Sequence, residues 1–202
     1  HLAYRYEVLF SLGSGAFGQV VKAIDHKTGE QVAIKIIINT KQMHSEGQIE
    51  SQILTKLNHK SCPNVVQTYD HFMFRNHICI SFEILGRDLY ELIHGRTYSR
   101  LLKPFSDSQI RSYTFQLFQG LAGIHEAGVV HCDIKPENIL VTNTNRSAIK
   151  IIDFGSGCFN GFQTYTYVQS RFFRAPEVVL GIKYGPAIDV WSAAMVIIEL
   201  MT

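Results

Sequence analysis

Short apolar runs and glycine turns alternate in the first part of the chain. The runs are rich in Val, Ile, Tyr and Phe and cover residues 6–12, 19–25 and 31–38. Such runs, bounded by turn residues, predict an antiparallel meander of three strands. Apolar residues at helical spacing follow in residues 45–57, where Ser45 has the position of an N-cap. This pattern predicts one amphipathic helix next to the strands.

A further hairpin and a long helix are predicted in the middle of the chain. Residues 65–74 and 77–85 form two strand-like runs around a polar turn, and Gly86 marks a change of character. Apolar residues repeat with a period near that of a helix over residues 106–126, with Ser106 suited as the N-cap. We therefore place a boundary between two lobes at Gly86.

The last part of the chain combines short strands, a long loop and an apolar helix. The two strands and the irregular stretch are residues 139–141, 149–152 and 155–174. Loops this long are commonly functional. The whole pattern predicts an α+β fold with a β-rich lobe in residues 1–85 and a mainly helical lobe in residues 86–202. The final apolar helix has no stop signal, and the chain begins at a histidine, so we expect further residues on both sides.

Composition and charge exclude some classes of protein. The chain has 202 residues, 46% of them hydrophobic, and a formal net charge of +2. This balance indicates neither nucleic-acid binding nor attraction to a membrane, and no apolar run approaches the ~20 residues of a membrane span. Four cysteines lack the spacing of a zinc site and fit a reduced, intracellular setting: Cys62, Cys79, Cys132 and Cys158.

A glycine-rich segment lies between the first two predicted strands. Residues 13–20 read Gly-Ser-Gly-Ala-Phe-Gly-Gln-Val, the pattern G-x-G-x-x-G-x-V. Because a strand and not a helix follows, the pattern favours a hairpin whose backbone N–H groups lie over phosphates. The alternative, glycines that only serve a β-turn, stays open for this motif alone.

A lysine interrupts the third apolar strand. Lys35 ends the run Val-Ala-Ile-Lys, and a buried ammonium needs a partner to keep its charge. The predicted helix offers Glu50, with Glu46 one turn earlier as the competitor. An ion pair from strand to helix would hold Lys35 where it can bind phosphate groups.

Residues 131–138, His-Cys-Asp-Ile-Lys-Pro-Glu-Asn, and the later Asp153-Phe154-Gly155 carry the strongest chemical signal. Phosphoryl transfer needs a carboxylate near the attacking hydroxyl, ligands for Mg²⁺, and positive charge on the transferred group. Asp133 supplies the first, Asn138 and Asp153 the second, and Lys135 the third.

With these motifs in place, the chain resembles the protein kinase family from about Tyr6 to its last residue. Residues 175–177, Ala-Pro-Glu, resemble the end of a kinase activation segment, and residues 189–191 resemble the central helix of the second lobe. The resemblance implies a two-lobed kinase fold, here cut off at the central helix, that uses ATP and Mg²⁺. It makes Asp133 the catalytic base and pairs Lys35 with Glu50.

The same resemblance implies a set of nucleotide-binding residues. Ala33 and Leu140 would sandwich the adenine, Glu83 and the following residues would form the hinge, and Phe82 would be a large gatekeeper; ordinary core packing is the alternative for all of them. The full set is Leu12, Gly13, Ser14, Gly15, Ala16, Phe17, Gly18, Val20, Ala33, Lys35, Phe82, Glu83, Leu85, Leu140 and Asp153.

Three segments are similar to the DYRK family of dual-specificity, tyrosine-regulated kinases, nearest its cytosolic branch. They are residues 75–79, His-Cys-Asp at 131–133 in place of the usual His-Arg-Asp, and residues 165–174. The resemblance implies autophosphorylation of Tyr167 and regulatory roles for Tyr165, Arg171 and Arg174. Because a thiol at 132 cannot bind a phosphate, we expect the two arginines to do so.

The resemblance also implies what the enzyme acts on. We expect a monomer in the cytoplasm or nucleus that phosphorylates Ser or Thr followed by Pro. Two alternatives are a pseudokinase scaffold and a small-molecule kinase. The complete set of catalytic residue types argues against the first, and the Ala-Pro-Glu segment with its long loop argues against the second.

Overall fold

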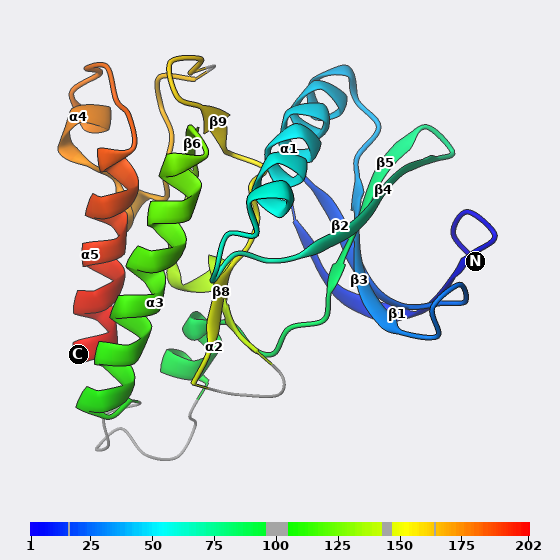
Figure 1. Cartoon of the computed structure of the whole chain (residues 1–202). Coiled ribbons are helices and arrows are strands. Elements are labelled where there is room, and N and C mark those ends of the chain that lie inside the picture. The colour runs from blue at the N-terminus through cyan, green and yellow to red at the C-terminus, as the bar shows by residue number, and fades with distance from the viewer. Residues whose placement is uncertain (16, 96–104, 143–146, 164) are drawn as a thin grey trace.

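The computed structural model describes residues 1–15, 17–95, 105–142, 147–163 and 165–202. Ala16, one of the expected nucleotide-binding residues, lies outside the described residues. The described chain forms two lobes, with the N-terminus in one and the C-terminus in the other (Figure 1). The predicted α+β arrangement of a β-rich and a mainly helical lobe is confirmed.

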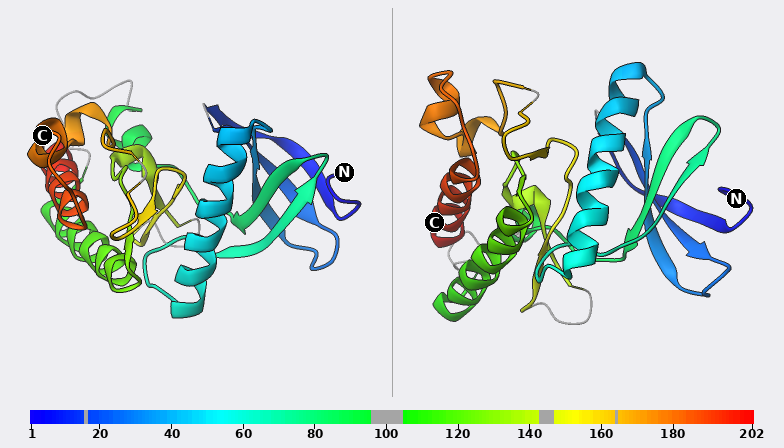
Figure 2. Two further views of the ribbon diagram at one scale, coloured as in Figure 1. Left: turned by 90° about the horizontal axis from the view of Figure 1, so that it is seen from above. Right: turned by 45° about the horizontal axis from the view of Figure 1, so that its top comes forward.

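The first lobe is a five-stranded antiparallel sheet with one helix against it. The strands, in the spatial order β1-β2-β3-β5-β4, are β1 Tyr6–Gly15, β2 Gly18–Asp25, β3 Gln31–Ile37, β4 Thr68–Phe74 and β5 His77–Glu83. Helix α1, Lys41–Lys60, runs between the sheet and the second lobe (Figures 1 and 2). Side chains of α1 can therefore contact both the sheet and the second lobe.

The start of α1 differs from the sequence prediction. The helix begins at Lys41 and not near Ser45, because the Thr40 hydroxyl accepts a hydrogen bond from the Met43 N–H at 3.3 Å. The apolar periodicity starts only later in the helix, so periodicity alone placed the first turn too far along the chain. Lys and Gln are good helix formers and extend the helix back to the cap.

The second lobe contains the remaining elements. They are α2 Leu89–His94, α3 Asp107–Glu126, β6 Val129–Val130, η1 Pro136–Asn138, β7 Ile139–Val141, β8 Ile149–Ile151, β9 Cys158–Phe159, η2 Arg171–Phe173, α4 Pro176–Val179 and α5 Ala187–Met201. Ser106 caps α3 as predicted, in a capping box with Gln109. Helices α3 and α5 pack side by side, and β7 pairs with β8.

Backbone hydrogen bonds join the two lobes at two places. The Val66 N–H donates to Ile151 O at 3.0 Å, and the Ile151 N–H donates to Asn64 O at 2.8 Å. On the other connection, the Gly86 N–H donates to Val141 O at 2.8 Å. The lobes are thus connected at the segment after α1 and at the segment after β5. Along the described stretches, every helix is too short or too polar to cross a lipid bilayer.

Candidate active site

The glycine-rich hairpin contains glycines of two kinds. Gly18 has a φ of +147°, and a Cβ there would lie 2.0 Å from the Ile36 oxygen, so the neighbouring strand requires this glycine. Among the described residues, nothing lies within 4 Å of a Cβ added at Gly13 or Gly15. Packing within the protein therefore does not explain these two, whereas the close approach of a ligand to the backbone would.

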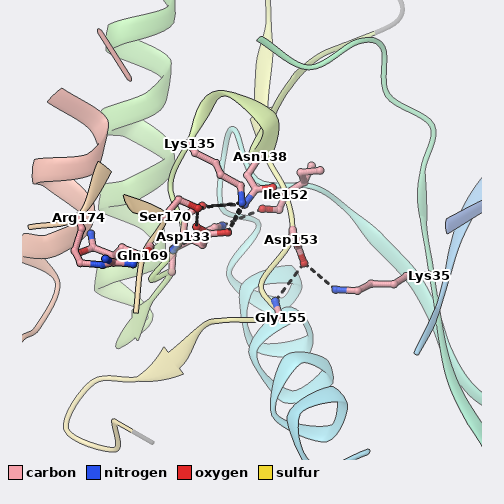
Figure 3. A network of polar contacts seen from close by, with 11 residues as sticks. Lys35, Asp133, Lys135, Asn138, Ile152, Asp153, Gly155, Gln169, Ser170 and Arg174 are labelled. Carbon is pink, nitrogen blue, oxygen red and sulfur yellow. Dashed lines mark hydrogen bonds and ion pairs between the residues drawn. The ribbon is translucent and has the colours of Figure 1, made fainter. Parts of the chain in front are cut away.

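Lys35 lies at the centre of a charged cluster between the lobes. Its Nζ is 2.8 Å from Asp153 Oδ1 in the second lobe (Figure 3). The same Nζ is 2.6 Å from Glu50 Oε1 on α1. Both Lys35 and Glu50 are buried. Of the two candidate partners left by the sequence, the structure places Glu50 and not Glu46 on the lysine.

The charges of this cluster depend on each other. Burial by itself lowers the pKa of Lys35, but the two carboxylates outweigh it and leave the pKa above its ordinary value. Burial raises the pKa of Glu50, and Lys35 only partly offsets that effect. For Asp153 the ammonium outweighs burial, so its pKa lies below the ordinary value. An ammonium that neutralises two carboxylates is thus available where the lobes meet.

Gly155 leaves room for this cluster. A Cβ at Gly155 would lie 3.2 Å from Lys35 Nζ and 3.3 Å from Asp153 Oδ1. Asp153 itself has a φ of +61°, which is unusual for a residue with a side chain. Backbone strain of this kind persists only where the surrounding structure holds it, and it is concentrated at functional sites.

A second polar cluster forms around Asp133 in the loop before η1. Asp133 Oδ2 is 2.8 Å from Lys135 Nζ, and Asp133 Oδ1 accepts a hydrogen bond from the Ser170 hydroxyl at 2.8 Å (Figure 3). Lys135 also donates to Ser170 at 3.2 Å. Ser170 was not singled out from the sequence, since a lone serine in a long loop carries no local signal of its contacts.

Asn138 and Asp153 present oxygens that suit a magnesium ion. The Asn138 amide nitrogen donates to the Asp133 carbonyl at 2.8 Å, which directs its oxygen away from that bond. Within the described parts of the chain, no hydrogen bond uses Asn138 Oδ1 or Asp153 Oδ2. Mg²⁺ prefers hard oxygen ligands and keeps several waters, so two protein oxygens next to bound phosphates fit it well.

Asp189 of α5 holds the loop that carries Asp133 in place. This buried carboxylate accepts the His131 N–H at 2.8 Å, the Cys132 N–H at 2.9 Å and a bond from His125 Nε2 at 2.9 Å. These bonds stabilise Cys132 in a left-handed conformation with a φ of +66°. The position of Asp133 is therefore determined by a charge in the core of the second lobe.

His131 connects this loop to the segment that carries Asp153. Its ring packs on Phe154 with centroids 4.8 Å apart, and Nε2 bonds the Ile152 carbonyl at 2.9 Å. Phe72 of β4 lies in a separate apolar cluster of the first lobe, where it stacks on Tyr6 with ring centroids 5.1 Å apart.

The expected adenine-binding residues lie on both sides of the segment that links the lobes. Ala33 of β3 pairs with Phe82 of β5, and Leu140 belongs to β7 across the interface. Both Phe82 and Leu85 pack against the main core. An ion pair with Lys150 connects Glu83, at the end of β5, to the second lobe.

Two further residues of the expected nucleotide-binding set lie on the first two strands. Leu12 of β1 is about half exposed, and Val20 of β2 lies opposite Lys35.

The remaining residues of the glycine-rich set lie on the same hairpin. Ser14 pairs with Gln19 across β1 and β2, and Gly15 pairs with Gly18. Phe17 lies in the turn between β1 and β2, and the centroid of its ring is 5.9 Å from Lys35 Nζ. The hairpin thus extends over the Lys35 cluster.

Arg174 organises the end of the long loop. Its guanidinium lies over the Tyr167 ring, 3.8 Å from the centroid, and contacts the Tyr167 hydroxyl. The same group donates to Val168 O at 2.9 Å and to Gln169 O at 2.6 Å. Gln169 has a φ of +68°. Arg171, the other expected phosphate ligand, begins η2 and is exposed.

Two thiols lie close to this site. Cys132 Sγ and Cys158 Sγ are 3.8 Å apart, and both cysteines are free. Both are buried, in the apolar cluster that underlies the end of the loop.

Comparisons with known proteins agree with this geometry. The family model described as "Protein kinase domain" matches residues 6–202. The DYRK-family kinase pom1 of Schizosaccharomyces pombe is 48% identical over 207 residues, and dual specificity tyrosine-phosphorylation-regulated kinase 4 of Homo sapiens is 46% identical over 205 residues. Dual specificity tyrosine-phosphorylation-regulated kinase 3 of Mus musculus is 45% identical over 205 residues. Each match covers 100% of this chain but only 18%, 39% and 34% of these relatives, respectively.

Proposed function

Since this chain belongs to the protein kinase family, and within it to the DYRK family, we propose that it transfers the γ-phosphoryl group of ATP to Ser and Thr hydroxyls of proteins. The observation that carries the proposal is the meeting of Lys35 and Asp153 across the lobes, beside the cluster of Asp133, Lys135 and Ser170 (Figure 3). These side chains come from four separate stretches of the sequence and converge on one interface.

Each side chain has a role that follows from its position. Asp133 accepts the proton of the substrate hydroxyl while that oxygen forms the new bond to phosphorus, and the bond from phosphorus to the oxygen of the departing ADP breaks. Lys135, 2.8 Å from Asp133, places positive charge next to the group in transfer. Lys35 holds the phosphates of ATP, and Glu50 orients Lys35. Bound Mg²⁺ would neutralise charge on the phosphates, with Asn138 and Asp153 as its protein ligands.

Phosphate transfer from radiolabelled ATP to a protein substrate tests this proposal. We expect the complete gene product to transfer phosphate and the Asp133→Asn variant to lose all but a small residue of that activity. Glu137→Gln is the matched control, because Glu137 lies only four residues after Asp133, in η1, but is exposed. Equal activity of Asp133→Asn and the control would reject the assignment, and an inactive wild-type protein would favour the pseudokinase alternative.

We further propose that the residue after the phosphorylated Ser or Thr is proline. The Gln169 carbonyl is turned by its positive φ and accepts from Arg174 Nη2 at 2.6 Å. The oxygen is therefore directed toward Arg174, and we propose that it does not accept an N–H from a bound peptide. Proline lacks this N–H and leaves no donor unpaired, whereas other residues would leave theirs unsatisfied.

Tyr167 is the residue that we propose to be autophosphorylated. Its side chain is 69% exposed, so it is accessible to modification. Arg174 already contacts the hydroxyl, and a guanidinium suits phosphate oxygens. Transfer to Tyr167 as well as to Ser and Thr would make the enzyme dual-specific. Peptide mapping of active protein tests this, and an unmodified Tyr167 in fully active enzyme would reject it.

We propose that the protein acts in the cytoplasm or nucleus, because its proposed substrate ATP is abundant inside cells, and we expect it to be a monomer. Imaging of a tagged protein and its mass in solution test both points. The branch within the DYRK family stays a prediction from the sequence.

A further inference from the structure

A tyrosine of the long loop contacts α1. The Tyr165 hydroxyl donates to Glu46 Oε1 at 2.5 Å, and Gln42 Nε2 donates to the same carboxylate oxygen at 3.0 Å. Glu46 raises the pKa of the Tyr165 hydroxyl, so the hydroxyl keeps its proton as the donor. This contact joins residues 119 positions apart in the sequence.

The contact lies one helical turn from the active-site ion pair. Glu46 and Glu50 are four residues apart on α1 and therefore on the same side of the helix. Glu50 holds Lys35 at 2.6 Å. A displacement of the first turns of α1 would move both carboxylates together, since a helix behaves as a stiff element.

The loop side of the contact is fixed. The Tyr165 carbonyl accepts from the Tyr184 hydroxyl at 2.6 Å, and Tyr184 packs against the apolar cluster next to α5. The α1 side has room, because a cavity of about 270 Å³ lies between this helix and residues 155–158. Breaking the contact would therefore displace α1 more than the loop.

We propose that Tyr165 is a positioning residue for α1 and a second modification site, and that its phosphorylation separates α1 from the loop and lowers activity. In that step the Tyr165 oxygen forms a bond to the γ-phosphorus of ATP, its proton passes to water, and ADP departs with the electrons of the broken P–O bond. The kinetic part rests on the proposed kinase function.

The charge next to Tyr165 gives the direction of the effect. Phosphorylation removes the donating proton and adds about −1.5 to −2 charge beside a carboxylate. Within the described residues, Glu46 Oε2 is buried without a hydrogen-bond partner, so nothing there neutralises it. The lysine of this part of α1, Lys41, lies in the first turn, whereas the Glu46 carboxylate is in direct contact with the Tyr165 hydroxyl.

Tyr167, two residues later, has a neighbour of the opposite charge. Its hydroxyl contacts Arg174, which would attract a phosphate. Two tyrosines of one segment therefore face opposite charges, and we infer opposite results of phosphorylation. Modification of Tyr167 orders the segment, whereas modification of Tyr165 releases α1.

The test places phosphotyrosine at Tyr165 in the complete gene product by genetic code expansion. Amide hydrogen exchange is compared between α1 and α3, and kcat/KM is measured on a protein substrate. We expect exchange in the first half of α1 to be about three- to tenfold faster, with α3 unchanged. We expect kcat/KM to fall by at least about tenfold, because the Lys35–Glu50 pair loses its position. Tyr165→Phe should show the faster exchange to a smaller extent.

Two matched variants make the test specific. Phosphotyrosine at Tyr90 is the control, since Tyr90 is 46% exposed like Tyr165 and lies on α2. In a Glu46→Lys background, phosphorylation of Tyr165 should slow exchange in α1, because the neighbour now attracts the phosphate. Unchanged exchange in α1, or the same change with Glu46→Lys, would overturn the proposal. Exchange does not depend on phosphate transfer, so an inactive enzyme would count against the proposed function and not against this contact.

Discussion

Lys150 of β8 forms an ion pair with Glu83, the last residue of β5, and so connects the two lobes beside the segment that joins them. The Glu83 carboxylate also accepts the Gln67 N–H at 2.7 Å. Both ionic side chains are mostly shielded from water, at 25% and 18% exposed. The pair therefore determines the direction in which the chain leaves β5 toward Leu85, where we expect ATP to bind.

Replacement of Lys150 by Met should weaken ATP binding more than it slows catalysis. A partly shielded ion pair contributes about 1 kcal/mol, which corresponds to a roughly fivefold higher KM for ATP. Steady-state kinetics with varied ATP check this, with Lys27→Met in an exposed turn as the control. A fall in kcat with no change in the KM for ATP would contradict the role of the pair.

Replacement of Arg174 by Lys should reduce the preference for proline. The guanidinium donates to two neighbouring carbonyls, Val168 O and Gln169 O, at the same time. A lysine ammonium lacks this fork and would release one carbonyl, which could then accept an N–H from the substrate. We expect the ratio of kcat/KM for Ser-Pro and Ser-Ala peptides to fall by about tenfold, roughly the value of one hydrogen bond.

The exposed Arg111→Lys of α3 is the control for that measurement. A ratio that stays at the wild-type value in Arg174→Lys would show that the Gln169 carbonyl does not select the substrate.

Replacement of Asp189 by Asn should destabilise the second lobe. The buried carboxylate accepts two backbone N–H groups and a bond from His125. An amide offers only one accepting oxygen and would direct its own N–H group toward one of these donors. We expect the free energy of unfolding to fall by about 2–4 kcal/mol in urea titrations. Asp107→Asn, at the exposed start of α3, should change it by less than about 0.5 kcal/mol.

The Lys35 cluster predicts a pH dependence of stability. The pKa of Asp153 is lowered in the folded protein by Lys35, so its stabilising effect is present above the unfolded pKa and is lost as pH falls through the folded pKa. Without Lys35, burial raises the pKa of Asp153 and of Glu50, and the sign reverses. The buried carboxylates then destabilise the protein at neutral pH, and protonation relieves this as pH falls.

The difference in unfolding free energy between wild type and Lys35→Met should therefore shrink by about 1 kcal/mol from pH 7 to pH 5. Urea titrations across this range measure it. The exposed Lys183→Met should give a difference that does not vary with pH. A constant difference for Lys35→Met would show that the two carboxylates stay charged without the ammonium.

The sequence alone determined the features that depend on near neighbours in the chain. The cap of α3 at Ser106 was predictable because a capping box needs only residues within one turn. The chemical types at residues 131–138 and 153–155 were also evident, and so was the need of Lys35 for a carboxylate, since a buried ammonium requires one wherever it lies.

Only the tertiary structure decided which distant groups meet. Glu46 and Glu50 share one side of α1, so packing of that helix was needed to place Glu50 on Lys35 and Glu46 on Tyr165. Strand β4 has an irregularity between Thr68 and Asp70. Since one extra residue moves every later side chain to the opposite face of a strand, the side on which Phe72 packs cannot be obtained from its position in the sequence.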